Sequence, residues 1–319
     1  TALPTETPAV EMVNVSSGAV ARSSPALEGP LQVVAGTTAA PVFMPARSMA
    51  VDAAGTNAYV LTTSGLSIVP LDVVSVSDRP AVNPRGIVNL ADFTASIAPN
   101  SLISIFGRNL AGDAVASQFP LPRNLGGACV TLNDSPIPLL MTSAGQINAQ
   151  IPPELATGRY NLVIRYFDKR LSGTAQQITL TRVAPAVFVD GGTLRTAIFH
   201  SDGSWVTKDN PARRDQRLVL YALGLGATIG GKASSGNPSP SRPLAQVEDV
   251  EVFFGDPRYK EAAIIVEWAG LAPGFAGLYQ INLYVPGAHI SGENLPITVR
   301  VAKVDSSNTG PVRPVVTVD

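Results

Sequence analysis

Short runs of apolar residues alternate with polar ones along most of the chain, and glycine or proline ends many of these runs. In GLYQINLYVP (277–286), apolar side chains at positions 279, 281 and 283 alternate with the amides Gln280 and Asn282. A period of two places neighbouring side chains on opposite faces of a β-strand, so one face is expected in the core and the other outside it. Pro286 ends the run, because proline has no N–H to donate to a neighbouring strand. The pattern predicts an all-β protein.

An earlier stretch, AGQINAQIPP (144–153), repeats this pattern. Four landmarks recur at one constant spacing along the chain: Gln146 with Gln280, Asn148 with Asn282, Pro152 with Pro286, and Gly158 with Gly292. Upstream, LISIFGRNL (102–110) resembles RLVLYALGL (217–225), and VTLND (130–134) resembles VFFGD (252–256). The spacings differ upstream, which indicates loop insertions between shared strands. We therefore expect one β-domain plan to be used twice.

The composition supports this fold class and limits the partners. The chain of 319 residues contains 28 glycines and 27 prolines, which is typical of short strands closed by turns. Only 15% of residues are charged and the formal net charge is -1, which argues against nucleic acid or an anionic membrane as partner, since both need a basic face. No apolar run is long enough for a membrane span. The single cysteine, Cys129, lies in an alternating apolar run and is expected to be a buried thiol.

Several motifs resemble those of a known domain family. FGRNLA (106–111), PLPRNLGG (120–127), GQINAQIP (145–152), LYALGLG (220–226) and AGLAPGFAGLYQINLYVP (269–286) are similar, in the same order, to motifs of an uncharacterised C-terminal domain family. That family occurs in large secreted proteins of Solibacter-type acidobacteria, and the resemblance extends from about Ile87 to Ala302. It implies an exported protein with immunoglobulin-like β-sandwich halves, often following a propeller-type region. It implies no activity and no catalytic residue.

The two ends of the chain differ from the repeated part. Residues 48–72 contain strands separated by glycine turns and resemble a single β-propeller blade, which cannot bury both of its faces alone. We expect an N-terminal strand region over 1–83 that is not independently stable, and two tandem immunoglobulin-like β-sandwiches over 84–183 and 184–305. An extended C-terminal tail over 306–319 would follow.

No constellation of residues typical of catalysis is present in the sequence. It lacks a G-x-S-x-G motif, and His200 and His289 lie far apart without cysteines or paired carboxylates nearby. Glu251 and its acidic neighbours Glu248 and Asp249 are expected on the solvated face of a strand. The glycines at 224–230 are not spaced as in a dinucleotide loop and are expected to form a turn. We predict no enzyme, no cofactor and no metal site, although a calcium site of backbone carbonyls has no motif and stays open.

Two classes of function remain. In the first, the protein is a secreted structural protein whose copies exchange terminal strands with one another and assemble into a filament or surface layer, so that its partner is itself. The candidate subunit contacts are the apolar residues of the two terminal segments: Val10, Met12, Val13, Val15, Val312, Val315, Val316 and Val318.

In the second class, the protein is a monomeric secreted adhesin or a carbohydrate-binding module, and its partner is an extracellular polysaccharide. Trp205 and Trp268 flank turns; they would stack on sugar rings if exposed, or fill the core if buried. The repeated amides also have two interpretations, as bonds to an adjacent loop or as a platform for sugar hydroxyls. These amides are Gln146, Asn148, Gln280 and Asn282.

Overall fold

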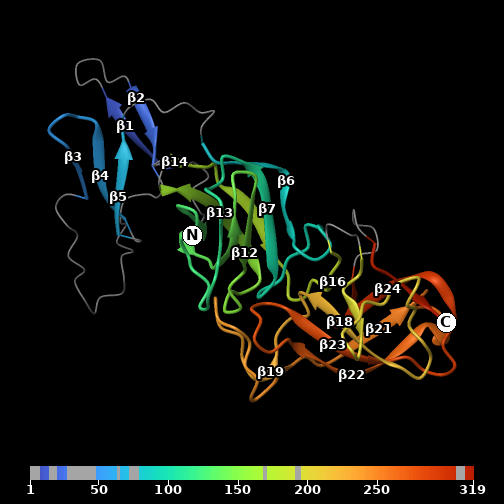
Figure 1. The fold of residues 1–319 in the computed structure, drawn as a ribbon. Helices are drawn as coiled ribbons and strands as arrows, with labels where there is room; N and C mark the ends of the chain where they lie inside the picture. The colour runs from blue at the N-terminus through green and yellow to red at the C-terminus, as the bar shows by residue number, and fades with distance from the viewer. Residues whose placement is uncertain are drawn as a thin grey trace.

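The computed structural model describes residues 8–13, 20–26, 48–62, 65–71, 79–167, 171–190, 195–306 and 313–319. Within these residues the chain forms β-strands joined by turns, together with a 3₁₀ turn, η3, at Lys260–Ala262 (Figure 1). The predicted all-β class is confirmed, with an N-terminal β region followed by two sandwich-like units. No helix in the described ranges has the length and hydropathy that crossing a membrane requires.

The N-terminal region packs a hairpin against a three-stranded sheet. Its strands are β1 (Ala9–Val13), β2 (Val20–Pro25), β3 (Met49–Val51), β4 (Asn57–Thr62) and β5 (Gly65–Pro70). β1 pairs with β2, while β3, β4 and β5 form the antiparallel meander expected for residues 48–72. Val10, Val60 and Val69 share one small core. The hairpin therefore covers one face of the blade-like sheet.

The first sandwich consists of two antiparallel sheets. Its strands are β6 (Ala81–Asn89), β7 (Leu102–Arg108), β8 (Ala114–Val115), β9 (Ala128–Leu132), β10 (Ser135–Pro136), β11 (Leu139–Thr142), β12 (Gln146–Gln150), β13 (Gly158–Tyr166), β14 (Leu171–Ser172) and β15 (Gln176–Leu180). One sheet has the order β6-β7-β12-β11-β8, and the other contains β10-β9-β13-β14 with β15 also on β13. The core lies between them and includes Ile105 and Ile147 from one sheet and Val130 and Leu162 from the other.

The second sandwich repeats this plan, but one long strand joins its two sheets. Its strands are β16 (Ala186–Val187), β17 (Ile198–His200), β18 (Arg217–Leu223), β19 (Ile229–Gly230), β20 (Ala245–Gln246), β21 (Val250–Phe254), β22 (Ala263–Leu271), β23 (Tyr279–Tyr284), β24 (Gly292–Val301), β25 (Val304–Asp305) and β26 (Val315–Val318). β22 pairs with β21 near its start and with β23 over the rest of its length. A register shift between Val266 and Trp268 interrupts the β22–β23 ladder.

The C-terminal strand belongs to the second sandwich. β26 pairs with β24 of the same chain, as β15 pairs with β13 in the first sandwich. Val316 and Val318 are 3% and 2% exposed and lie in the core of the second sandwich. The sandwich therefore continues beyond the expected boundary at residue 305, because its edge strand comes from the segment that was expected to be a tail.

This arrangement bears on the candidate subunit contacts. Val315, Val316 and Val318 are used within the chain, so the structure lends no support to strand donation by this segment. Val10 likewise packs inside the N-terminal region. Of the other candidates, Met12 and Val13 lie in β1 with side chains outside the described part, and Val15 and Val312 lie outside the described residues altogether.

Candidate functional site

In each sandwich, a glutamine–asparagine pair lies on the outer face of the central strand. Ile147 and Ile281, which separate the two members of each pair, are fully buried, so the amides point away from the core. Nε2 of Gln146 donates to Oδ1 of Asn148 over 2.8 Å, and the corresponding bond from Gln280 to Asn282 is also 2.8 Å. The two amides of each pair thus bond to each other. One of the two interpretations of the sequence had them bond to an adjacent loop instead.

The strand register confirms that the repeated motifs occupy equivalent places. Gln146 lies opposite Phe106 of β7, and Gln280 lies opposite Tyr221 of β18. We call the outward-facing set Ser104, Phe106, Met141, Gln146 and Asn148 the first amide face, and the set Val219, Tyr221, Trp268, Gln280 and Asn282 the second amide face. Each combines an amide pair with an aromatic ring on the neighbouring strand.

Trp268 distinguishes the second amide face from the first. It lies opposite Asn282, is only partly exposed and belongs to none of the core clusters of the described residues. A Cβ built on Gly270 would lie 2.5 Å from the six-membered ring of the indole and 2.3 Å from the backbone oxygen of Ala245. The indole therefore rests on Gly270, a position where no side chain fits. Since Gly270 lies opposite Gln280, the ring lies beside the amide pair.

Trp205 extends the second amide face on the side opposite Trp268. Its ring packs on Phe199 with centroids 4.4 Å apart, and Phe199 meets Tyr221 edge-on at 5.7 Å. Phe199 lies opposite Val219 of the second amide face, so the register aligns Phe199, Val219, Asn282 and Trp268 in one row across four strands. Phe199 was not singled out from the sequence, although its place between the buried Ile198 and His200 is the signal of an outward-facing side chain.

Charged groups border the second amide face at one end. Arg217 donates from Nε to Glu267 at 2.9 Å, and its guanidinium lies 5.9 Å from the ring centroid of Tyr284. The hydroxyl of Tyr284 donates to Asp215 over 2.8 Å, and this bond raises the pKa of Tyr284. This edge therefore offers carboxylate acceptors and a guanidinium donor to a polar ligand.

An apolar pocket of about 340 Å³ lies where the two sandwiches meet. Leu102 reaches it from the first sandwich, and Phe199 and Tyr221 reach it from the second. Two exposed aromatic rings, Phe119 and Phe275, belong to its lining, one from each sandwich, and they are 45% and 56% exposed. The pocket therefore adjoins the Phe199–Tyr221 side of the second amide face.

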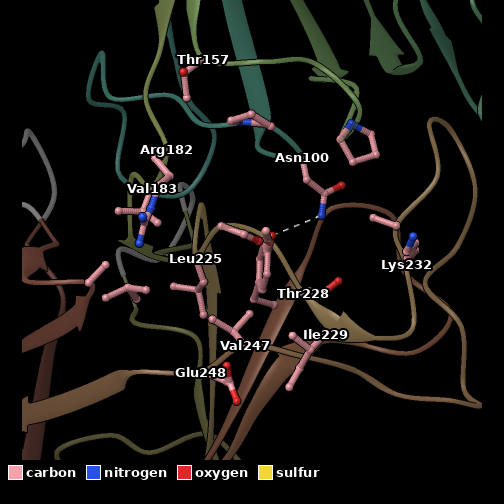
Figure 2. A pocket seen from close by; sticks show the side chains of 18 of the residues that line it. Asn100, Thr157, Arg182, Val183, Leu225, Thr228, Ile229, Lys232, Val247 and Glu248 are labelled. Carbon is pink, nitrogen blue, oxygen red and sulfur yellow. Dashed lines mark hydrogen bonds between the residues drawn. The ribbon is translucent and has the colours of Figure 1, made fainter.

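A larger cleft of about 700 Å³, lined by both apolar and charged side chains, opens at the same junction (Figure 2). Asn100 and Arg182 approach it from the first sandwich and the segment that follows, and Lys232 and Glu248 from the second (Figure 2). Among the described residues that line it, the only aromatic ring is that of Tyr279, which is fully buried. The cleft can form hydrogen bonds and ion pairs, but it presents no exposed ring for stacking.

The two histidines, His200 and His289, form structural contacts. The ring of His200 lies between Nε2 of Gln216 at 2.9 Å and the carbonyl of Asn210 at 3.2 Å, so both of its nitrogens are used. His289 is buried and its ring meets Phe254 edge-on. No group of three or more potential metal ligands occurs within the described residues.

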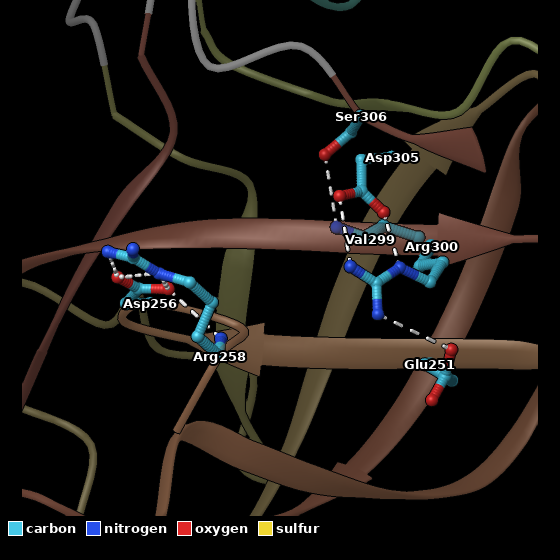
Figure 3. A network of polar contacts seen from close by, with 7 residues as sticks. All are labelled: Glu251, Asp256, Arg258, Val299, Arg300, Asp305 and Ser306. Atoms are coloured by element: carbon cyan, nitrogen blue, oxygen red, sulfur yellow. Dashed lines mark hydrogen bonds and ion pairs between the residues drawn. The ribbon is translucent and has the colours of Figure 1, made fainter. Parts of the chain in front are cut away.

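The acidic strand position at Glu251 belongs to a surface network (Figure 3). Arg300 pairs bidentately with Asp305, lies 3.9 Å from Glu251, and places its guanidinium 5.0 Å from the ring centroid of Phe253. The hydrogen bond to Asp305 is the main cause that raises the pKa of Arg300. The network fastens β21, β24 and β25 together, so Glu251 takes part in a structural contact on the outer face of its strand.

Comparison with known proteins gives structural likeness only. No protein-family model matches the chain, and no curated protein matches it significantly. Among solved structures, SGBP-B of the mixed-linkage glucan utilization locus of Bacteroides ovatus, in complex with a mixed-linkage heptasaccharide, is 14% identical with a TM-score of 0.33, covering 82% of this chain and 53% of that one. A structure with a xylogluco-oligosaccharide is 13% identical with a TM-score of 0.23, covering 72% of this chain and 40% of that one.

The adhesin FdeC of Escherichia coli is also 13% identical, with a TM-score of 0.20, covering 82% of this chain and 74% of that one. This chain thus spans about half the length of the first of these proteins and less of the second. TM-scores this low carry no functional assignment to the present chain.

Proposed function

We propose that the protein binds polysaccharide non-covalently through the second amide face, in the role of a secreted carbohydrate-binding or adhesive protein. The observation that supports this most directly is the indole of Trp268 lying beside the Gln280–Asn282 pair on an outer sheet face. A pyranose ring has apolar C–H faces and a rim of hydroxyls, so its recognition needs an aromatic surface next to hydrogen-bonding groups.

The amide pair retains unused hydrogen-bonding capacity. Nε2 of Gln280 is engaged by Oδ1 of Asn282, and among the described residues no further partner contacts Oε1 of Gln280 or Nδ2 of Asn282. One acceptor and one donor group are thereby available side by side, which suits two neighbouring sugar hydroxyls that each donate and accept. The bond between the two amides holds both of them in place before a ligand arrives, which lowers the entropic cost of binding.

The larger cleft is a weaker candidate for the same ligand class, because the described residues that line it include no exposed aromatic ring. Assembly by strand exchange forms no part of this proposal, since β26 already pairs with β24 in the same chain. Secretion remains a sequence-based expectation within the proposal.

The test is affinity electrophoresis through gels that contain mixed-linkage β-glucan, xyloglucan, xylan, glucomannan or dextran. We expect at least one polysaccharide to retard the wild-type chain. Trp268→Ala should remove the retardation, while Trp268→Phe, which keeps a ring, should retain part of it. Gln280→Ala should weaken binding about two- to tenfold, the equivalent of one hydrogen bond.

Tyr259→Ala is the matched control, because Tyr259 is an exposed aromatic residue, 58% accessible, outside the second amide face. It should migrate as the wild type does in every gel. Absence of retardation of the wild type in all five gels, or equal retardation of the wild type and Trp268→Ala, would refute the proposal. A reducing-end assay on the same polysaccharides should stay at background if the protein binds without cleaving.

A further inference from the structure

The first amide face has the same elements as the second, in a slightly different form. Phe106 lies opposite Gln146, where Tyr221 lies opposite Gln280. Oδ1 of Asn148 accepts both from Gln146 and from the buried hydroxyl of Ser104, at 2.8 and 3.0 Å. Among the described residues, no partner contacts Oε1 of Gln146 or Nδ2 of Asn148, so the same donor and acceptor are available as in the second copy.

The outer faces of the two sandwiches meet at the apolar pocket. Leu102, from the same side of β7 as Phe106, lines the pocket together with Tyr221 of the second amide face. Leu102 and Phe106 are four residues apart on one strand, which corresponds to about 13 Å. Tyr221 belongs both to the pocket and to the second amide face. Tyr221 therefore joins the second amide face to the pocket directly, and β7 leads from the pocket at Leu102 to the first amide face at Phe106.

A buried hydrogen-bond chain holds the two sandwiches in one relative orientation. Nε2 of Gln150 donates to Asn100 over 2.9 Å, and Oε1 of Gln150 accepts from the backbone N–H of Gly236 over 2.7 Å. Asn100 in turn contacts the hydroxyl of Tyr279 at 3.4 Å. Gln150 and Asn100 come from the first sandwich, and Gly236 and Tyr279 from the second. A fixed junction keeps the two amide faces in one relative orientation. A ligand that contacts both faces therefore avoids the entropic cost of orienting them.

We infer that the two amide faces and the apolar pocket between them form one extended surface, which takes an internal stretch of a linear β-1,4-linked glycan rather than a single sugar or a chain end. This inference rests on the proposed function. A β-1,4 chain is a flat ribbon with apolar ring faces, which suits two outer sheet faces that each carry an aromatic ring beside an amide pair. The pocket supplies apolar contact between the faces, with Phe119 and Phe275 as its exposed rings.

Calorimetric titration with cellobiose, cellotetraose and cellohexaose tests the inference. Because contacts to a second face act at high effective concentration, wild-type affinity should rise at least about tenfold from cellobiose to cellohexaose. Phe119→Ala and Gln146→Ala should reduce cellohexaose affinity by about three- to tenfold, and should thereby lower the ratio of cellohexaose to cellobiose affinity. Trp268→Ala should weaken binding at every length.

Phe167→Ala is the matched control, since Phe167 is as exposed as Phe119, at 45%, but lies outside the pocket lining and both amide faces. Both phenylalanines are about half exposed and lie in none of the core clusters of the described residues, so neither substitution should prevent folding, and thermal melting checks this. Equal wild-type affinity for all three lengths, or no effect of Phe119→Ala and Gln146→Ala on cellohexaose, overturns the extended surface while leaving the second amide face as a site. Retardation in polysaccharide gels without any binding of cello-oligosaccharides overturns the β-1,4 assignment but not the proposed function.

Discussion

The side-chain amide of Asn100, in the first sandwich, lies 3.4 Å from the phenolic oxygen of Tyr279, in the second. The Tyr279 hydroxyl donates in turn to the backbone carbonyl of Gly226 over 2.6 Å. Tyr279 has no exposed surface, so this contact between sandwiches is shielded from water. Hydrogen bonds in such surroundings are costly to leave unpaired, which makes the junction a sensitive place for substitution.

Raising the pH should destabilise the protein through Tyr279. Burial raises the pKa of Tyr279 to about 12, against the bond from Asn100, which acts in the other direction. The stability that comes from keeping this hydroxyl neutral is fully present below the unfolded-state pKa near 10, and is lost as the pH rises through about 12. The full loss of unfolding free energy from this group is about 3 kcal/mol. Urea unfolding across this alkaline range measures it.

Tyr279→Phe should lack that alkaline loss, although it should be less stable than the wild type at neutral pH because the carbonyl of Gly226 loses its donor. Tyr160→Phe is the control, since the Tyr160 hydroxyl bonds the carbonyl of Ala156 at an exposed position. An alkaline transition that is the same in wild type and Tyr279→Phe would show that another group causes it.

Two glutamines of the same strand, β12, should differ sharply when each is changed to alanine. Gln150→Ala removes the partner of Asn100 and of the Gly236 N–H, both buried, and should cost about 1–3 kcal/mol in free energy of unfolding. Gln146→Ala, on the outer face, should change it by less than about 0.5 kcal/mol. Urea denaturation measures the free energy of unfolding of both variants. Equal losses would mean that the hydrogen bonds of Gln150 at the junction do not stabilise the fold.

The C-terminal strand should contribute to the stability of the second sandwich. Val316 is 3% exposed in its core, so Val316→Ala should cost about 1–3 kcal/mol. Thr317→Ala, at the neighbouring half-exposed position, should cost much less. Urea unfolding gives the free energies, and size-exclusion chromatography should show both variants at the elution volume of the wild type. A Val316→Ala variant as stable as the wild type would exclude this strand from the core in solution.

Asp92 should lower stability at neutral pH. The residue is 2% exposed, and burial raises the pKa of its carboxyl, against the lowering effect of hydrogen bonds from the backbone N–H and the hydroxyl of Thr94. A carboxyl of this kind contributes stability that is present below the unfolded-state pKa near 4 and is lost as the pH rises through the folded-state value. Asp92→Asn keeps the acceptor for Thr94 and removes the buried charge. It should therefore be more stable than the wild type at pH 7 and nearly equal to it at about pH 3.

Asp202 provides the opposite case. Hydrogen bonds from Ser204 lower its pKa, so its stabilising contribution is present above the unfolded-state pKa and is lost as the pH falls. Asp202→Asn should accordingly be less stable than the wild type at neutral pH. Urea unfolding of both asparagine variants at the two pH values tests the pair, and the same sign of change in both would contradict the assignment.

The repeated pattern of the central strands could be predicted from the sequence because alternation has a direct physical meaning. In both copies, residues spaced by two enter the core, as the buried Ile147 and Ile281 show, and the amides between them point outward. The resemblance of residues 102–110 to 217–225 likewise corresponds to equivalent strands, with Phe106 and Tyr221 opposite the first amide of each pair. Local periodicity decides which face of a strand a side chain occupies, so these features could be predicted from the sequence alone.

The partners of these strands and faces were decided only by the tertiary structure. The apolar C-terminal segment was readable as a strand, but backbone hydrogen bonds carry little sequence information, so its pairing with β24 of the same chain could not be distinguished from pairing with another copy. The position of Trp205 on Phe199 and the meeting of both outer faces at one apolar pocket depend on contacts between residues far apart in the chain. Alternation along a strand therefore determined inside and outside, while long-range packing at the junction decided which outer surfaces lie together.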